Sequence, residues 1–218
     1  MITYEDIKKN EVIRTYIKKA DESLIALGYT EHSFAHVAKV AEDAGQILAA
    51  LSSDEHEVEL VKIAGFLHDI GNLVNRVEHS QSGAVMAFRI LDKLGMDAAD
   101  IAEIVTAIGN HDEGTGKPVS RIAAALFLAD KSDVRRSRVR CDQSEFDIHD
   151  RVNYSVTAST LKINEEKTEI TLDLTIDTSV SSVTDYFEIF LERMILCRKA
   201  AEKLGLRFRL RINEQILM

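Results

Sequence analysis

The sequence predicts an α+β fold in which an all-helical bundle is followed by a small antiparallel β-β-α-β unit. Three observations support this prediction. Apolar residues recur at three- and four-residue intervals through the first 140 residues, which is typical of buried helix faces. Beyond residue 150, two segments alternate apolar and polar residues as strands do. The change of period places a boundary near residue 145 and divides the chain into residues 1–145 and 146–218.

Six helices are expected in the first region, each marked by one apolar stripe. They span Ile7 to Leu27, Ser33 to Leu51, Asp54 to the residues before Gly71, Ser82 to Leu94, Ala98 to Ile108, and Pro118 to Ala129. Gly71 is expected to supply a left-handed stop, and Gly95 and Gly109 to end the next two helices. Pro118, the single proline, suits the first residue of a helix because it has no amide hydrogen to lose there.

The second region is expected to contain three strands and one helix. Residues 152–163 and 168–177 alternate around the turn sequence NEEK, and the second of these segments places Ile170, Leu172, Leu174 and Ile176 on one face. A helix from Ser182 to Leu204 follows, with Gly205 as its stop, and residues 206–213 (LRFRLRIN) alternate again. Such a unit buries the apolar face of its sheet beneath its helix.

Composition restricts the class of protein. A chain of 218 residues that is 45% hydrophobic can bury a substantial core. Its net charge of −9 argues against broad non-specific DNA binding, which depends on clustered Lys and Arg. Two cysteines make neither a disulfide framework nor a thiolate zinc cluster. The apolar runs are short and the N-terminal segment is charged, so a cytoplasmic protein without a membrane segment is expected.

Several ionisable residues stand where a helical stripe predicts an apolar one. His36 precedes Val40 by four residues, and Asp130 follows Leu126 by four. His68-Asp69 falls at the end of its helix. A buried carboxylate is costly unless a cation or several donors lie nearby. Imidazoles and carboxylates from different helices can hold one or two divalent metals, and a bridging aspartate would keep two ions about 3.5–4 Å apart.

These residues resemble the H…HD…D signature of the HD superfamily of metal-dependent phosphohydrolases. The matching segments are HVAKVAEDA for His36, AGFLHDIGN for His68-Asp69 and FLADKSD for Asp130, and the resemblance covers about residues 30–140. The segments HSQSGA and NHDE resemble those that carry two further histidines in dinuclear HD proteins, which adds His79 and His111. HSFAH offers two first histidines: the family's H-x-x-x-V spacing favours His36, and His32 is then a neighbour that orients ligands or substrate.

The resemblance implies an all-helical domain that hydrolyses a phosphomonoester or phosphodiester, of a nucleotide or nucleic acid. It also implies that Asp69 and His68 belong to a catalytic centre that holds one or two divalent ions. With two ions bound, Asp69 would be the ligand that bridges them. Mixed nitrogen and oxygen ligands suit Fe, Mn, Zn, Co or Ni better than Mg alone. By contrast, His56 is expected to be solvated, and His149-Asp150 lies in a polar linker where no metal role is expected.

A basic segment follows Asp130. Lys131, Arg135, Arg136 and Arg138, with Arg140 beyond them, are candidate contacts for the phosphate of a small molecule, a nucleotide or RNA. The alternative is a solvated loop or a set of interdomain ion pairs. Likewise, the arginines of LRFRLRIN are expected to form cross-strand ion pairs with Glu169 and Asp173, or an anion-binding surface if those strands are not neighbours.

Two other functional readings compete with the enzyme. A regulatory module would keep the cage of HD residues to bind a metal and a phosphorylated ligand without turnover, and would use its C-terminal unit as a partner surface. A purely structural protein would have to satisfy His36 and Asp130 by hydrogen bonds alone. The last helix also has enough aromatic and aliphatic surface for a homodimer contact.

Overall fold

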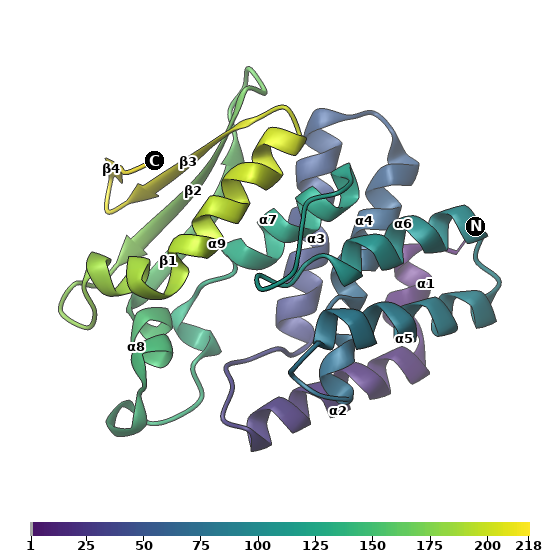
Figure 1. Cartoon of the computed structure of the whole chain (residues 1–218), viewed down its shortest axis with the longest axis horizontal. Helices are drawn as coiled ribbons and strands as arrows, with labels where there is room; N and C mark the ends of the chain where they lie inside the picture. Colours follow the sequence, from purple (N-terminus) through teal and green to yellow (C-terminus); the bar gives the residue numbers. More distant parts are fainter. Residues whose placement is uncertain (1) are drawn as a thin grey trace.

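Seven helices form a bundle at the N-terminal end of residues 2–218, the part of the chain that the structure describes. In this computed structural model they are α1 (Tyr4–Lys9), α2 (Glu11–Ala26), α3 (Phe34–Leu51), α4 (Glu55–Leu67), α5 (His79–Leu94), α6 (Ala98–Gly109) and α7 (Arg121–Ser132). Figure 1 shows the bundle on the right and the C-terminal sheet on the left. α3 packs against both α4 and α7, which brings the helices that carry His36, His68 and Asp130 together.

Capping side chains decide where these helices begin. Asn10 accepts hydrogen bonds from the backbone amides of Val12 and Ile13, so the helix expected from Ile7 to Leu27 is two helices, α1 and α2. Ser33 and Asp54 cap α3 and α4 near the expected positions. Ser120 caps α7, so that helix begins after Pro118 and not at it.

The helix α7 lies in the interior of the bundle. All of its residues after Arg121 are buried, including the polar Asp130, Lys131 and Ser132 at its C-terminal end. Buried polar groups need partners. Ser132 donates its hydroxyl to the Ala129 carbonyl, and its own carbonyl accepts a hydrogen bond from Ser159. The polar C-terminal end of α7 is therefore buried against other protein groups and does not face solvent.

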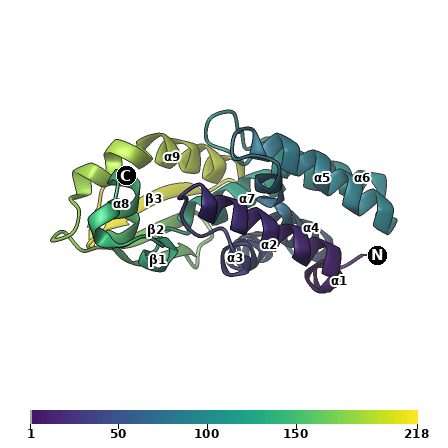
Figure 2. The ribbon, with the colours of Figure 1, turned by 90° about the horizontal axis from the view of Figure 1, so that it is seen from below.

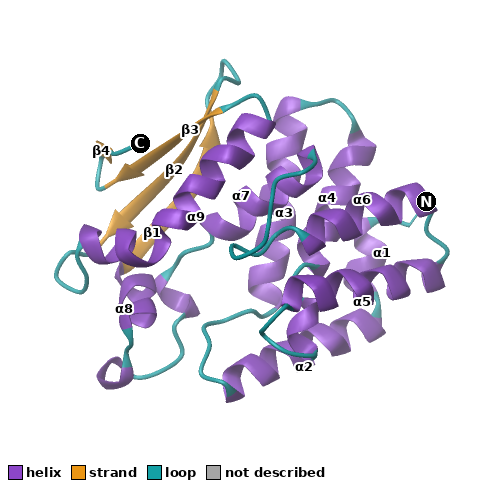
Figure 3. Cartoon of the chain, viewed as in Figure 1, coloured by secondary structure: helices purple, strands orange, loops and turns teal. Residues whose placement is uncertain are grey.

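The C-terminal region contains a four-stranded sheet. Figure 3 shows this sheet beside a long helix. Its elements are α8 (Ile148–Ser155), β1 (Val156–Ile163), β2 (Glu169–Ile176), α9 (Val183–Lys203), β3 (Arg207–Ile212) and β4 (Gln215–Ile216), with strand order β1-β2-β3-β4. The expected apolar face of β2 is buried. The α+β class is thus confirmed.

Two expectations for this region were wrong. β1 and β2 are antiparallel, as are β3 and β4, but β2 and β3 are parallel. α9 is the cause, because a helix that crosses back over the sheet starts the next strand in the same direction. The strand expected from Val152 begins only at Val156: Asp147 and Asp150 form a capping box that starts α8 in its place.

The arginines of β3 form ion pairs on the sheet surface. Arg209 contacts Glu169 at 3.0 Å, and Arg211 contacts Asp173 on the neighbouring strand β2. The expectation of cross-strand ion pairs is confirmed, so these arginines are not an unpaired anion-binding surface. Such exposed pairs stabilise a sheet by about 1 kcal/mol or less.

The two regions share one hydrophobic core. α9 packs on α7, and Cys197 is buried within this core as a free thiol. Figure 2, seen from below, shows the sheet and α9 continuing the bundle along its length. Among residues 2–218, every helix is too short or too polar to cross a membrane. The boundary near residue 145 stays a prediction.

Candidate metal centre

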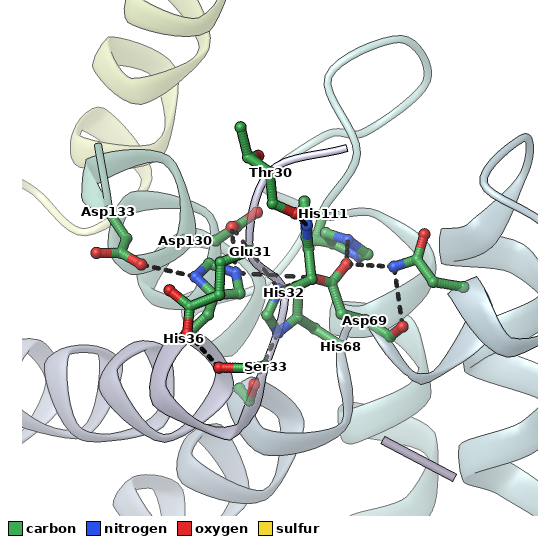
Figure 4. Close-up of polar contacts among 12 residues, drawn as sticks. Thr30, Glu31, His32, Ser33, His36, His68, Asp69, His111, Asp130 and Asp133 are labelled. Atoms are coloured by element: carbon green, nitrogen blue, oxygen red, sulfur yellow. Dashed lines mark hydrogen bonds and ion pairs between the residues drawn. The ribbon is translucent and has the colours of Figure 1, made fainter. Parts of the chain in front are cut away.

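The ionisable residues converge because they stand at the ends of helices. His36 lies in the first turn of α3, His68 directly follows α4, and Asp130 lies in the last turn of α7. His79 is the first residue of α5, and His111 follows α6. Figure 4 shows the side chains of His36, His68, Asp69, His111 and Asp130 gathered in one place. All of these side chains are about nine-tenths buried or more.

The turn after His68 differs from the expected left-handed stop. Gly71 has no positive φ and lies in a short 3₁₀ helix, Ile70–Leu73. A Cβ at Gly71 would stand 2.0 Å from the carbonyl oxygen of His79, so glycine allows α5 to approach the end of α4. α5 also begins earlier than expected, at His79 and not at Ser82. The close approach brings His79 into the site.

The two oxygens of Asp69 face two different histidine pairs. Oδ2 lies 3.5 Å from Nε2 of His36 and 3.3 Å from Nε2 of His68. Oδ1 lies 3.5 Å from Nε2 of His79 and 3.9 Å from Nε2 of His111. Asp69 therefore stands between two clusters in the position of a bridging carboxylate.

Asp130 belongs to the cluster on the Oδ2 side of Asp69. Its Oδ1 lies 3.4 Å from Nε2 of His36 and 3.7 Å from Nε2 of His68. Asn72 orients the other oxygen of Asp69, since its amide donates to Oδ1 at 3.0 Å. Within residues 2–218, the ligand atoms of His36, His68 and Asp130 form one compact group, and those of His68, Asp69 and His111 form another.

Every histidine of the centre is held through its Nδ1 atom. Nδ1 pairs with an oxygen acceptor in each: Asp133 Oδ2 at 2.7 Å for His36, Gly65 O at 2.7 Å for His68, Arg76 O at 3.0 Å for His79 and Ile108 O at 2.6 Å for His111. An acceptor at Nδ1 requires the proton to be on Nδ1 in the neutral ring. The lone pair is then on Nε2, the atom that faces the centre.

The unpartnered atoms fit a metal. His36 Nε2, His68 Nε2 and Asp69 Oδ2 are buried without a hydrogen-bond partner within residues 2–218. Nε2 of His79 and Nε2 of His111 lie 3.1 Å apart, two lone pairs that face each other and repel unless a cation lies between them. Ligand atoms about 2.0–2.2 Å from one ion lie roughly 3–3.6 Å from each other, close to the separations here.

At four of the six positions the electrostatics favour the protonation states that metal ligands need. His68 is an exception: burial lowers its pKa, but Asp69 and Asp130 raise it above the ordinary value. Burial raises the pKa of Asp69 and of Asp130, but His68 beside Asp69 and Lys131 beside Asp130 hold both pKa values well below the ordinary range. Burial lowers the pKa of His79 and lowers that of His111 further. At neutral pH the carboxylates are ionised and these two imidazoles are neutral.

A cavity of about 280 Å³ opens over the centre. Of the predicted phosphate contacts, Lys131 and Arg138 line it, and so does His32, whose Nε2 lies 4.0 Å from Asp69 Oδ2. Arg135 and Arg136 lie outside the lining, where Arg135 pairs with Glu31 and Asp133 and Arg136 pairs with Asp177. Arg136 thus forms an ion pair between the two regions, as the alternative expected, whereas the acidic partners of Arg135 belong to the helical region itself.

Other residues at the site were missed. Asp133 holds His36, and its spacing of three residues after Asp130 was a usable signal, since residues three apart share a helix face. Arg76 lies 3.4 Å from Nε2 of His79. Arg193 reaches the cavity from α9, and no local pattern marks it. His149 also lines the cavity, outside both ligand clusters.

The family model for the HD domain matches residues 31–135, in agreement with the motif. An uncharacterised protein of Methanocaldococcus jannaschii is 27% identical over 189 residues, which covers 75% of this chain and 72% of that protein. The crystal structure of a protein described as a predicted HD superfamily hydrolase, from an uncultured Thermotogales bacterium, is 25% identical. It covers 62% of this chain and 75% of that one, with a TM-score of 0.47. Residues 31–135 are thus identified as an HD domain.

Proposed function

We propose that the protein hydrolyses a phosphomonoester or phosphodiester of a nucleotide or nucleic acid through a dinuclear metal centre. The observation that carries this proposal is the position of Asp69, whose two oxygens each face a separate pair of histidines. His36, His68 and Asp130 would hold one ion, and His79 and His111 would hold the other. Bound divalent ions would supply an activated water and neutralise charge on the phosphoryl oxygens.

The chain's own residues prepare the site for an anionic ester. Lys131 places its ammonium 2.8 Å from Asp130 Oδ2 and lines the cavity, so it adds positive charge where a phosphoryl oxygen would lie. His32 is fixed by its Nδ1 contact to the Thr30 carbonyl at 2.7 Å and presents Nε2 towards Asp69. Asp69 and His68 keep the catalytic role that the HD signature implies.

The ligand set narrows the choice of metal. Four imidazoles and two carboxylates suit Fe, Mn, Zn, Co or Ni, whereas Mg prefers oxygen ligands and water. The expectations of a cytoplasmic location and of a homodimer contact stay predictions, as does RNA as a ligand.

The test couples metal analysis to a substrate panel. We expect more than one equivalent of transition metal per purified chain, and turnover of at least one among nucleoside phosphates, cyclic dinucleotides and short RNA. Asp69→Ala should abolish turnover and lower metal content without unfolding the chain, while the exposed Asp92→Ala should do neither. Undiminished hydrolysis by metal-free protein would rule the proposal out. Ligand-induced thermal stabilisation without any turnover would favour the regulatory module in its place.

A further inference from the structure

The cavity over the metal centre is closed by the C-terminal region as well as by the HD domain. Asp147, His149 and Asn153, at and within α8, line it together with Phe190 and Arg193 of α9. Figures 1 and 2 both show α9 beside the bundle, with the loop between α6 and α7 reaching towards it. The C-terminal region is therefore placed where it can contact a bound substrate.

One chain of ion pairs joins α9 to the metal ligand Asp130. Arg193 Nε donates to Glu113 Oε1 at 2.7 Å, and Glu113 Oε1 lies 3.6 Å from Lys131 Nζ. Lys131 in turn contacts Asp130 at 2.8 Å. Glu113 thus positions two cations, one from each region, on the same wall of the cavity.

Arg193 is held as a rigid side chain. Its guanidinium lies 3.8 Å from the centroid of the Phe190 ring, and its side chain is only 20% exposed. Within residues 2–218 its hydrogen bond to Glu113 uses Nε, which leaves the two Nη groups to donate to a ligand. A stacked arginine with two available donors is well suited to bind a phosphoryl oxygen.

The wall of the cavity formed by α8 carries acceptors and negative charge. Asp147 caps α8 and lines the cavity with Asp150. Asn153 is buried, and its amide nitrogen donates to the His149 carbonyl, which leaves its oxygen as an acceptor. This wall repels a second phosphate and accepts hydrogen bonds from hydroxyl or amino groups. A nucleic-acid strand is therefore disfavoured as a substrate, because its further phosphates would have to pass along this negatively charged wall.

We propose that the C-terminal region completes the substrate site and restricts it to small phosphomonoesters with an uncharged organic part rich in hydroxyl or amino donors, such as a nucleoside 5′-monophosphate. This inference rests on the proposed phosphohydrolase function. Arg193 and Lys131 bind the phosphoryl group, Glu113 positions them, and the α8 wall selects the organic part. The cavity volume of about 280 Å³ lies at the small end of the range for small-molecule pockets, roughly 300–1,000 Å³, which favours a small ligand over a polymer.

The first experiment compares Arg193→Gln with Arg198→Gln, an exposed arginine of the same helix outside the cavity lining. With a nucleoside 5′-monophosphate, Arg193→Gln should raise KM about 10-fold or more with little change in kcat, because it removes binding common to the ground and transition states. Arg193→Lys should recover part of the loss, and Arg198→Gln should behave as wild type. An unchanged KM in Arg193→Gln would overturn the proposal.

The second experiment changes the charge of the α8 wall. Asp147→Asn keeps a good helix cap and removes one negative charge. Wild type should prefer the monophosphate over a nucleoside triphosphate and a dinucleoside monophosphate, and Asp147→Asn should raise kcat/KM for the triphosphate several-fold relative to the monophosphate. A wild-type preference for the diester, or an unmoved ratio in the variant, counts against the proposal.

A binding measurement separates this proposal from the proposed function. The thermal unfolding midpoint is followed with increasing nucleoside 5′-monophosphate, and wild type and Arg198→Gln should be stabilised more than Arg193→Gln. Absence of turnover in wild type would refute the hydrolase alone, since this measurement still tests the site. Equal stabilisation of all three proteins would refute the site, whatever their turnover.

Discussion

At the scale of single residues, His36 shows how the ring of a candidate metal ligand is oriented by its neighbours. Its Nδ1 is held by Asp133 at 2.7 Å, and Asp133 is in turn paired with Arg135 at 2.9 Å. Burial raises the pKa of Asp133, but its bond to His36 and the nearby Arg138 hold that pKa well below the ordinary range. Asp133 is therefore ionised, and it orients the His36 ring by accepting a hydrogen bond from Nδ1.

Removal of Asp133 should weaken metal binding without removing a ligand. We expect Asp133→Ala to lower affinity for a transition metal about 10- to 100-fold, and Asp133→Asn, which keeps an acceptor, to lower it less. Competition with a chelator of known affinity measures both changes. Asp92→Asn on the exposed face of α5 is the control. Equal affinities in all four proteins would mean that Asp133 has only a structural role.

His36 and Asp130 were predictable as candidate ligands because each breaks a local apolar pattern, whereas His79 and His111 were expected only from the resemblance to dinuclear HD proteins. His36 and Asp130 stand on buried helix faces, and the structure brings all six candidate ligands together around Asp69. Arg193 and Glu113 meet across 80 residues of sequence, so no local pattern could indicate their contact. Arg135 and Arg136 have the composition of phosphate contacts, and only the fold shows the acids beside them.

At the scale of elements, the junction of α4 and α5 decides whether the second histidine pair forms. A Cβ added at position 71 would lie 2.0 Å from the His79 carbonyl oxygen and 2.5 Å from the Gly83 amide nitrogen. Both contacts are to backbone, which cannot move away as a flexible side chain can. A larger residue would push the start of α5, and with it His79, away from Asp69.

We expect Gly71→Ala to lower the free energy of unfolding by about 1–3 kcal/mol or more and to lower the metal stoichiometry. Gly109→Ala is the matched control, since its Cβ would meet Ala84 at an ordinary 3.7 Å. In that helical position alanine should be neutral or stabilise by up to about 1 kcal/mol. Urea denaturation and metal analysis give the two readouts. Full stability and unchanged stoichiometry in Gly71→Ala would contradict the role of this close approach.

Element types were easier to predict than their connections. The alternation in β2 gave its buried face correctly, because that pattern lies within eight residues. The segment 152–155 reads as part of a strand, yet the capping box between Asp147 and Asp150 makes it the end of α8. The parallel pairing of β2 and β3 depends on where α9 packs, and α9 packs on α7 as well as on the sheet. Neither effect is visible in the periodicity of a strand.

At the scale of the whole molecule, one buried cluster of ionisable groups affects stability as well as function. Burial is the main cause that lowers the pKa of His32, His79 and His111 below the ordinary value of about 6.5. Burial also lowers the pKa of His68, but Asp69 and Asp130 overcome it and hold that pKa above its ordinary value. Three histidines thus resist protonation in the folded state, and one favours it.

The metal-free protein should therefore lose stability as the pH falls below about 6.5. In that range His32, His79 and His111 bind protons in the unfolded state but stay neutral in the folded state, so protonation favours unfolding. His68 has the opposite effect, because its pKa is raised in the folded state. Its stabilisation of the fold is present below about pH 6.5 and is lost as the pH rises through that raised pKa. We expect the unfolding midpoint of chelator-treated protein to drop between pH 7.5 and 5.5. His79→Gln with His111→Gln should flatten the slope, because two groups that resist protonation are gone. A midpoint that rises on acidification, or an unchanged slope in the double variant, would show that these imidazoles are already protonated in the fold.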